Sequence, residues 1–317
     1  MRTSLFALTL LLAGTAQAQE VRTDRGTLRG ATAEGVASFK GIPYAAAPVG
    51  PLRWHAPMPV PGWTGTRDAA GYGNDCVQAR MPGDLANTTL PMSEDCLFLN
   101  VWTPRPRAGA KLAVMVYIHG GGFSTGSGSA AILDGSRLAA RGVVVVTFNY
   151  RLGRFGFFAT PALTREAGGG PTGNWALMDQ LAALQWVKRN IASFGGDPAN
   201  VTIFGESAGG ESVSRLMVSP AAKGLFAKAI AASGGGRDSW PDLAAGEAKG
   251  LAFAKHAGAE DLAALRALPA DKVQGGINLL NGDEAHYSGP MTDGRIVTGD
   301  TDALLAAGKA RGIRYVV

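Results

Sequence analysis

The sequence predicts an α/β protein with a mostly parallel central sheet flanked by helices. Two apolar runs, at residues 112–118 and 143–146, have the near-continuous hydrophobic character of strands that are buried on both faces. A later segment, residues 176–191, places leucines at helical spacing and predicts an amphipathic helix. Strands that alternate with helices in this order are typical of a sheet with crossover connections.

Residues 1–18 predict a secretory signal peptide. Arg2 gives a positive start, residues 5–14 form an apolar core too short to span a bilayer, and Ala16 and Ala18 fit a cleavage site. We therefore expect residues 19–317 to form one domain of a secreted or periplasmic protein. No later stretch is apolar for long enough to predict a membrane span.

Composition favours one sizeable domain and gives no sign of a nucleic-acid-binding face. A 46% share of hydrophobic residues in 317 can build one large core. The net charge is +5, but the basic residues are scattered and form no stripe that could follow a phosphate backbone. Nothing in the sequence indicates an oligomeric state.

The two cysteines, Cys76 and Cys96, suit an exported protein. An even number in an oxidising compartment favours a disulfide that closes a local loop. Two buried free thiols are the alternative. A zinc site is disfavoured because no further Cys or His lies at ligand spacing.

The N-terminal part, residues 20–75, is rich in Gly and Pro turns and predicts a small antiparallel ribbon around residues 36–39. We expect little chemistry there. Arg53, Trp54 and His55 could suggest a binding site, but a packed corner is the simpler interpretation. Residues 97–103 alternate in hydrophobicity and predict the next strand.

The apolar run at residues 112–118 ends in His119, three glycines and Phe123. Consecutive glycines let backbone N–H groups turn toward a small negative charge, as an oxyanion hole requires. A flexible turn and a phosphate cradle are the alternatives. The phosphate cradle is the weaker of these, because no Lys-Ser/Thr pair follows.

The middle of the chain continues the alternation. After the strand at residues 143–146, residues 150–153 predict a loop. In the helix predicted at residues 176–191, Asp179 lies early and Lys188 and Arg189 lie late, which complements the helix dipole. The Gly- and Pro-containing residues 195–198 predict a break before the next strand.

Ser207 is the candidate nucleophile. It lies in a Gly-x-Ser-x-Gly pattern that follows an apolar strand and precedes a helix-compatible segment ending near Ser219. Ser124 lies in a second such pattern, but in a run of Gly and Ser that leads into more loop. Further on, the sequence predicts a strand at residues 226–232, Ala-rich helices within residues 241–285 and a last strand at residues 313–317.

These motifs together resemble the type-B carboxylesterase and lipase family, the α/β-hydrolases that include the cholinesterases. The matches are residues 94–101 (EDCLFLNV), 119–123 (HGGGF), 149–153 (NYRLG), 194–198 (FGGDP) and 205–210 (GESAGG). They occur in the order of the family and cover nearly all of the mature chain, but only the N-terminal part of the family's domain. The resemblance implies an α/β-hydrolase fold that is truncated on its C-terminal side.

The resemblance also implies site residues. Ser207 would attack a small carboxylic ester and form an acyl-enzyme, without a metal or cofactor. The oxyanion hole would be formed by the backbone N–H groups of Gly121, Gly122 and Ala208. Glu206 and Ser233 would lie near the catalytic acid and base, and Trp240 would be the acyl-pocket tryptophan. Cys76 and Cys96 would form the first disulfide of the family. Choline esters are not expected, because residues 77–95 contain no aromatic residue.

The resemblance assigns no residue of this sequence to the acid or the histidine of the family's catalytic triad. The family places them beyond a segment like residues 289–294, so we expect an incomplete chain that is inactive or nearly so on its own. A compressed triad using His256 or His286 is the less favoured arrangement, since His286 lies in a predicted surface loop, and His119 would instead shape the glycine loop. A catalytically silent protein-binding module of the same fold is the alternative function.

Overall fold

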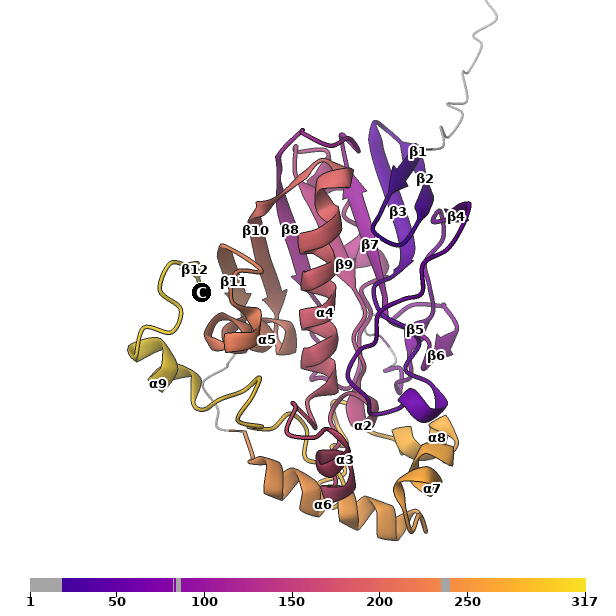
Figure 1. The fold of residues 1–317 in the computed structure, drawn as a ribbon, viewed down its shortest axis with the longest axis vertical. Helices are drawn as coiled ribbons and strands as arrows, with labels where there is room; N and C mark the ends of the chain where they lie inside the picture. Colours follow the sequence, from indigo (N-terminus) through magenta and orange to yellow (C-terminus); the bar gives the residue numbers. More distant parts are fainter. Residues whose placement is uncertain (1–18, 82, 84–86, 235–239) are drawn as a thin grey trace, which may run out of the picture.

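The computed structural model describes residues 19–81, 83, 87–234 and 240–317, so the predicted signal peptide at residues 1–18 lies outside the described residues. A ten-stranded sheet forms the centre of the molecule (Figure 1). Its strands are, in spatial order, β1 (Gln19–Arg22), β2 (Thr27–Ala33), β3 (Val36–Pro43), β7 (Phe98–Thr103), β9 (Val144–Phe148), β8 (Leu112–Ile118), β10 (Gly196–Glu206), β11 (Lys228–Ala232) and β12 (Arg314–Val316), with β4 (Thr66–Asp68) beside β2.

The sheet has an antiparallel part and a parallel part. Strands β1, β2, β3, β7 and β9 pair antiparallel, which confirms the predicted N-terminal ribbon. From β9 onward, through β8, β10, β11 and β12, every pair is parallel, as predicted. The chain leaves β8 for β9 on one side and returns to β10 on the other. Such a reversal opens a crevice at the carboxyl ends of the strands.

Helices cover the sheet and its lower end. Figure 1 shows α4 lying across one face of the sheet, with α5 beside it, and α6, α7 and α8 below the carboxyl ends of the strands. The helices are α1 (Ser136–Ala139), α2 (Gly153–Gly156), α3 (Pro161–Glu166), α4 (Trp175–Asn190), α5 (Ala208–Val218), α6 (Leu243–His256), α7 (Leu262–Ala267), α8 (Ala270–Gln274) and α9 (Thr301–Ala306). No helix among the described residues is both long enough and apolar enough to cross a membrane.

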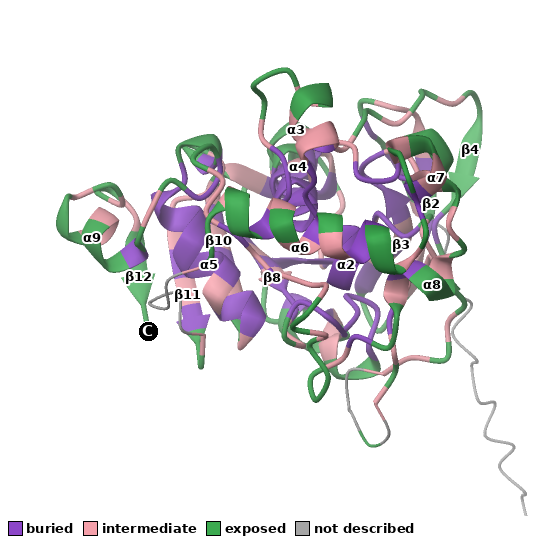
Figure 2. Cartoon of the chain, turned by 90° about the horizontal axis from the view of Figure 1, so that it is seen from below, coloured by how far each residue is buried: buried purple, intermediate pink, exposed green. Residues whose placement is uncertain are grey.

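The core lies between the sheet and its helices, with most of the helical residues contributed by α4 and α5. All five residues of β9 are buried, as the apolar run predicts. In β8, by contrast, only Val114, Val116 and Ile118 are fully buried, while the residues between them are half-buried. One face of β8 is therefore fully covered and the other only in part. Figure 2 shows buried residues of α5, β10 and β11 side by side, between the centre of the molecule and α9 with β12.

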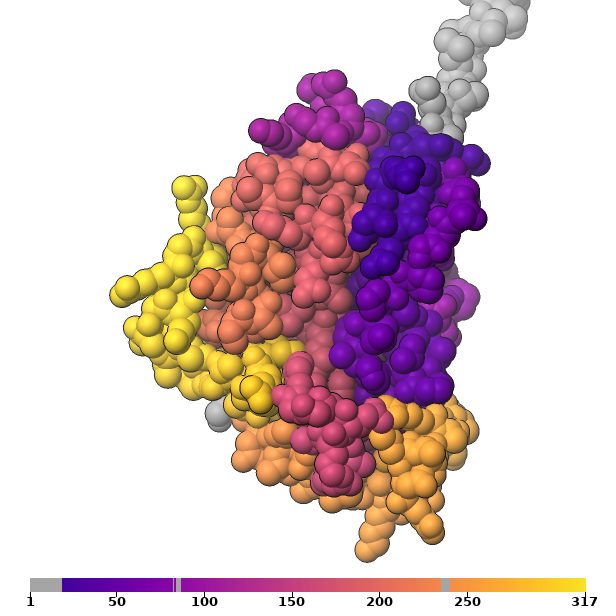
Figure 3. All heavy atoms as spheres, viewed as in Figure 1, coloured from indigo at the N-terminus to yellow at the C-terminus, as the bar shows by residue number. Residues whose placement is uncertain are grey.

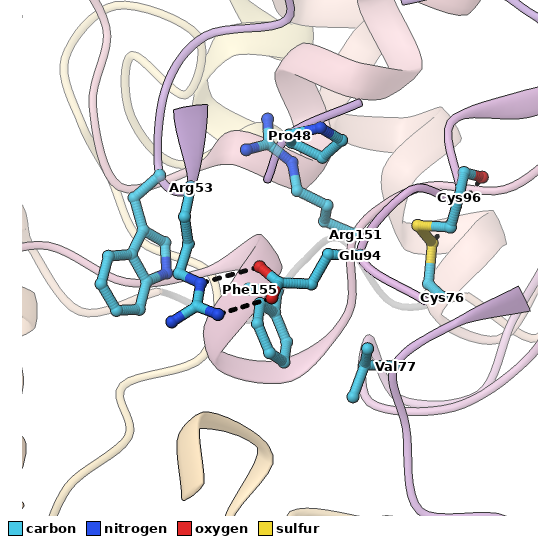
Figure 4. Close-up of a pocket in the computed structure, with 9 residues that line it drawn as sticks. Pro48, Arg53, Cys76, Val77, Glu94, Cys96, Arg151 and Phe155 are labelled. Carbon is cyan, nitrogen blue, oxygen red and sulfur yellow. Dashed lines mark hydrogen bonds and ion pairs between the residues drawn. A yellow bond between two sulfur atoms is a disulfide. The ribbon is translucent and has the colours of Figure 1, made fainter. Parts of the chain in front are cut away.

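The N-terminal corner is packed rather than open, which confirms that interpretation of Arg53 and Trp54. Both side chains are buried, and the Trp54 indole N–H donates to the Arg154 carbonyl at 2.7 Å. The Arg53 guanidinium forms a two-pronged pair with Glu94 at 2.7 and 2.5 Å (Figure 4). The Cys76–Cys96 disulfide lies beside this pair in the same small pocket, so neither free thiols nor a zinc site occurs there.

Two local predictions were wrong in detail. Asp179 does not serve the dipole of α4; it is fully buried and binds Arg151. The break predicted at residues 195–198 is narrower than expected. Gly195 turns the chain with a left-handed φ of 87°, but β10 already begins at Gly196 and contains a register shift before Val201. A long-range ion pair and a strand irregularity leave no local pattern in the sequence.

The buried pair of Arg151 and Asp179 generates a stability prediction. One Asp179 oxygen accepts from the Arg151 backbone N–H at 3.0 Å and from Nε at 2.8 Å, and the other oxygen accepts from the guanidinium at 2.8 Å. Asp179→Asn leaves a buried guanidinium without its counter-charge, so we expect a loss of about 3–5 kcal/mol in the free energy of unfolding, measured by urea denaturation.

The double variant Arg151→Met/Asp179→Leu is the matched control, because it removes both charges. We expect it to recover a large part of the lost stability. A double variant as unstable as Asp179→Asn would show that packing, and not the unpaired charge, causes the loss.

Candidate active site

Ser207 stands at a sharp bend between β10 and α5. Its backbone has φ 54° and ψ −125°, a combination that costs a residue with a side chain of order 1–3 kcal/mol. Two hydrogen bonds hold the bend, because the Ser207 N–H donates to the Ala232 carbonyl at 2.9 Å and the Ser207 carbonyl accepts from Glu211 at 2.9 Å. The serine is half-buried at the end of the strand, as the predicted strand–turn–helix setting requires.

Glycines make this bend possible. A Cβ on Gly209 would lie 2.0 Å from the Ile118 carbonyl oxygen, and a Cβ on Gly205 would lie 2.5 Å from the Gly209 backbone. A Cβ on Gly210 would meet the Ala232 carbonyl oxygen at 2.7 Å. The start of α5 therefore touches the ends of its neighbouring strands backbone to backbone, and any side chain at these positions would push it away.

The glycine run after β8 forms a tight loop. Gly121 and Gly122 both have positive φ, 105° and 57°, which is the region that favours glycine. The Gly121 carbonyl accepts from the N–H groups of Ser124 and Thr125, both at 3.0 Å, so it faces into the loop. Within the described part of the chain, the N–H groups of Gly121 and Gly122 donate to no protein acceptor. They are available to a ligand.

The glycine loop lies against the bend. A Cβ on Gly120 would be 3.2 Å from the Ser207 Cβ and 2.7 Å from the Glu206 carbonyl oxygen. Ala208 is the first residue of α5 and is buried, so its N–H has no carbonyl four residues earlier within the helix. The structure thus brings Ser207 and the start of α5 against Gly120, the first glycine of the loop that contains Gly121 and Gly122, at the carboxyl ends of β8 and β10.

The other predicted site residues surround this place. Glu206 precedes the serine, and its carboxylate lies 3.1 Å from the position of a Cβ on Gly120. Ser233 directly follows β11, whose Ala232 pairs with Glu206 in register. The Trp240 ring contacts Phe123 edge to face, with ring centres 6.0 Å apart, and lies under the Arg215 guanidinium at 4.2 Å. Trp240 therefore packs next to the glycine loop.

The His119 side chain packs against the glycine loop on its buried side. It is buried, its ring stacks on Tyr150 with centres 4.1 Å apart, and its Nδ1 lies 2.9 Å from the Gly120 carbonyl oxygen. The Tyr150 hydroxyl donates to the His119 carbonyl at 2.7 Å. Burial lowers the pKa of His119 to about 4, so the imidazole is neutral at pH 7. This position agrees with the loop-shaping role expected for His119.

The remaining candidates from the sequence lie elsewhere. Ser124 is buried and donates to the Gly121 carbonyl at 3.3 Å, inside the loop and away from any helix start. His256 and His286 stack on each other with centres 4.6 Å apart, and His286 contacts Asp283 at 3.0 Å. His286 is half-buried, so the prediction of a simple surface loop was only partly right. Among the described residues, no histidine side chain contacts the Ser207 hydroxyl.

Sequence reasoning missed Arg154. Its side chain is buried beneath the loops that surround the crevice, where it pairs with Asp283 and donates to the carbonyls of Val273 at 3.0 Å and His286 at 3.3 Å. It is the next residue after the matched NYRLG segment, and a basic residue among apolar neighbours was the only signal for it.

The buried His119 generates a prediction of pH dependence. The pKa of about 4 lies below the value near 6.5 of an unfolded chain, so the unfolded state binds more protons below pH 6.5. His119 therefore contributes full stability above pH 6.5, and this contribution falls as the pH drops toward 4. We expect a loss of about 3 kcal/mol over this window from His119, measured by urea denaturation.

His119→Gln is the matched variant, because it keeps a polar side chain of similar size without the titration. Its stability should fall less steeply between pH 6.5 and pH 4 than that of the wild type. Curves that run parallel across this window would contradict the assignment of the loss to His119.

Comparison with known proteins gives esterases. Fumonisin B1 esterase of Sphingopyxis macrogoltabida is 43% identical over 330 residues, which cover 99% of this chain and 59% of that protein. Para-nitrobenzyl esterase of Bacillus subtilis (strain 168) is 50% identical over 229 residues, which cover 72% of this chain and 46% of that protein. The chain spans about half the length of these curated relatives.

Solved structures have the same fold over the described chain. A PNB esterase structure superimposes with a TM-score of 0.82 and 40% identity, covering 94% of this chain and 62% of that one. The carboxylesterase EST55 of Geobacillus stearothermophilus at pH 6.2 gives a TM-score of 0.81 and 40% identity, covering 93% of this chain and 60% of that one. The fold predicted from the resemblance, an α/β-hydrolase, is therefore confirmed.

The family comparison covers almost all of the chain. The model of the carboxylesterase family matches residues 17–317, a range that contains the bend, the glycine loop and the disulfide. The chain belongs to the carboxylesterase family.

Proposed function

We propose that Ser207 is the nucleophile of a serine carboxylesterase that hydrolyses small carboxylic esters through an acyl-enzyme. One observation carries the proposal: the serine at the strained bend lies against Gly120, at the start of a glycine loop in which the Gly121 and Gly122 amides have no protein acceptor among the described residues. Neither Ser124 nor any other serine of the described chain combines these features. The esterase relatives support the same reaction class.

The proposed chemistry has two half-reactions. The Ser207 oxygen attacks the ester carbonyl, and the oxygen of the resulting tetrahedral intermediate accepts hydrogen bonds from the amides of Gly121, Gly122 and Ala208. The C–O bond to the alcohol then breaks, and the alcohol leaves with a proton. Water attacks the acyl-enzyme in the same way, which releases the carboxylic acid and restores the serine.

A base and an acid complete such a mechanism, and we propose that neither acts within this chain alone. The described His119, His256 and His286 are held in ring stacking, and burial lowers the pKa of His119 to about 4, which makes it a weak proton acceptor. Glu206 and Ser233 lie at the carboxyl ends of β10 and β11, where they would orient such groups. On its own the chain would therefore hydrolyse esters slowly.

We also propose that the protein functions outside the cytoplasm, in the periplasm or the medium. A disulfide between Cys76 and Cys96 persists in an oxidising compartment and suits this location. The disulfide closes the segment that carries the Glu94 contact to Arg53, so it stabilises the corner beside the site.

Ser207→Ala and Ser124→Ala give a matched test, since both serines lie in a Gly-x-Ser-x-Gly pattern. We expect slow hydrolysis of p-nitrophenyl acetate by the wild-type chain, and acceleration by added imidazole, which supplies a base. Ser207→Ala should abolish the enzyme-dependent rate that imidazole accelerates, because the attacking oxygen is gone. Ser124→Ala should keep most of it.

A fluorophosphonate probe provides a second readout, because it reports a covalent bond to the serine oxygen. Labelling in the presence of imidazole should occur at Ser207, identified by peptide mass spectrometry. Hydrolysis that survives Ser207→Ala would refute the proposal. Failure of both hydrolysis and labelling would favour the alternative, a catalytically silent protein-binding module.

A further inference from the structure

A turn that carries two exposed leucines lies directly beside the glycine loop. A Cβ on Gly122 would be 2.4 Å from Cδ2 of Leu279, so the leucine side chain rests against the Cα of Gly122. Leu279 is nevertheless 51% exposed and Leu280 is 88% exposed. Large apolar side chains that stay exposed beside a candidate site are typical of a ligand-binding surface.

The turn is held rigidly despite its exposure. Asn278 and Asn281 exchange backbone hydrogen bonds at 2.9 and 3.2 Å, which fixes the two leucines at the tip. The Asn278 side-chain oxygen accepts from the N–H of Leu280 at 2.8 Å and from that of Asn281 at 3.1 Å. The side chain of Gln274 braces the entry to the turn through bonds to Gly276 and to the Ile277 carbonyl, both at 2.7 Å.

The base of the turn is anchored under the site. Ile277 is 1% exposed and packs toward Gly153, whose N–H donates to the carbonyl of Phe123 at 2.8 Å. Arg154 holds both ends of the segment, because it binds the carbonyls of Val273 and Gln274 on one side and both Asp283 and the His286 carbonyl on the other. In Figure 3 the orange segment that contains α6, α7 and α8 and leads into this turn forms the lower end of the molecule.

We infer that Leu279 and Leu280 form an apolar lip of the ester site, which selects substrates with an extended apolar substituent next to the carbonyl. This inference rests on the proposed function, because the carbonyl oxygen would accept from the Gly122 amide while the substituent contacts Leu279. A substituent of one or two carbons is too short to cover both leucines, whereas a chain of about six carbons covers them and removes both from water. The lip would therefore favour medium-chain esters over acetates.

The test compares p-nitrophenyl hexanoate with p-nitrophenyl acetate in the presence of imidazole. In the wild-type chain we expect a higher kcat/KM for the hexanoate. The double variant Leu279→Asn/Leu280→Asn should lose roughly tenfold of this preference, with the acetate rate nearly unchanged. Leu251→Asn is the matched control, because Leu251 is 53% exposed, about as much as Leu279, and lies on a different element, α6.

A binding readout separates this inference from the proposed function. The affinities for 4-nitrophenyl hexyl ether and 4-nitrophenyl methyl ether, which cannot be hydrolysed, are measured by calorimetry for the same variants. Loss of the hexyl preference in the double variant, without any hydrolysis in the wild type, would support the lip and refute the esterase. Equal preferences in the wild type and the double variant, in either assay, would overturn the lip. Equal melting temperatures for the three proteins exclude a folding effect.

Discussion

The structure depends on one backbone contact, between the start of α5 and the end of β8. The position of a Cβ on Gly209 is 2.0 Å from the Ile118 carbonyl oxygen, so the two segments touch without any side chain between them. This contact fixes the angle at which the chain turns from β10 into α5, and it places Ser207 in a strained conformation that hydrogen bonds on both sides retain. A side chain in place of Gly209 would move Ser207 away from the glycine loop, since the serine and the loop follow the ends of adjacent strands.

The same contact explains why the candidate site lies where it does. Strands β8 and β10 are parallel neighbours, so their carboxyl ends meet although Ile118, the last residue of β8, and Glu206, the last residue of β10, lie far apart in the sequence. The chain reverses direction across the sheet between these strands, which leaves no crossover connection above their ends. The glycine loop and the N-terminus of α5 place backbone N–H groups at the carboxyl ends of these two strands. Amides of this kind can stabilise a developing oxyanion without a cationic side chain.

Much of this could be predicted from the sequence, because the features are local. The strands, the bend at Ser207 and the glycine loop each leave a short pattern, and context separated Ser207 from Ser124. The rest depends on contacts between distant residues. Asp179 was assigned to the dipole of its own helix, whereas it binds Arg151 in a loop after β9. The contacts of Arg154 with Asp283 and the lip at Leu279 join segments that periodicity and motif spacing treat separately.

The helices and loops below the carboxyl ends of the strands are held partly by buried arginines, and this affects how precisely the residues of the site are positioned. The backbone carbonyl groups of these loops form few of the regular hydrogen bonds of helices and strands, so they need other hydrogen-bond donors. Buried arginines supply them: Arg53 bonds to the Leu268 carbonyl at 2.6 Å, and Arg154 bonds to carbonyls at both ends of the leucine turn. Each planar guanidinium carries five donors and can fix several segments at once. Because the guanidinium groups of Arg53 and Arg154 are buried, dissolved salt weakens their interactions only slightly. The loops around Ser207 are therefore held by fixed hydrogen bonds as well as by the apolar core, which extends into the helices below the strands through Phe253, Leu265 and Val273.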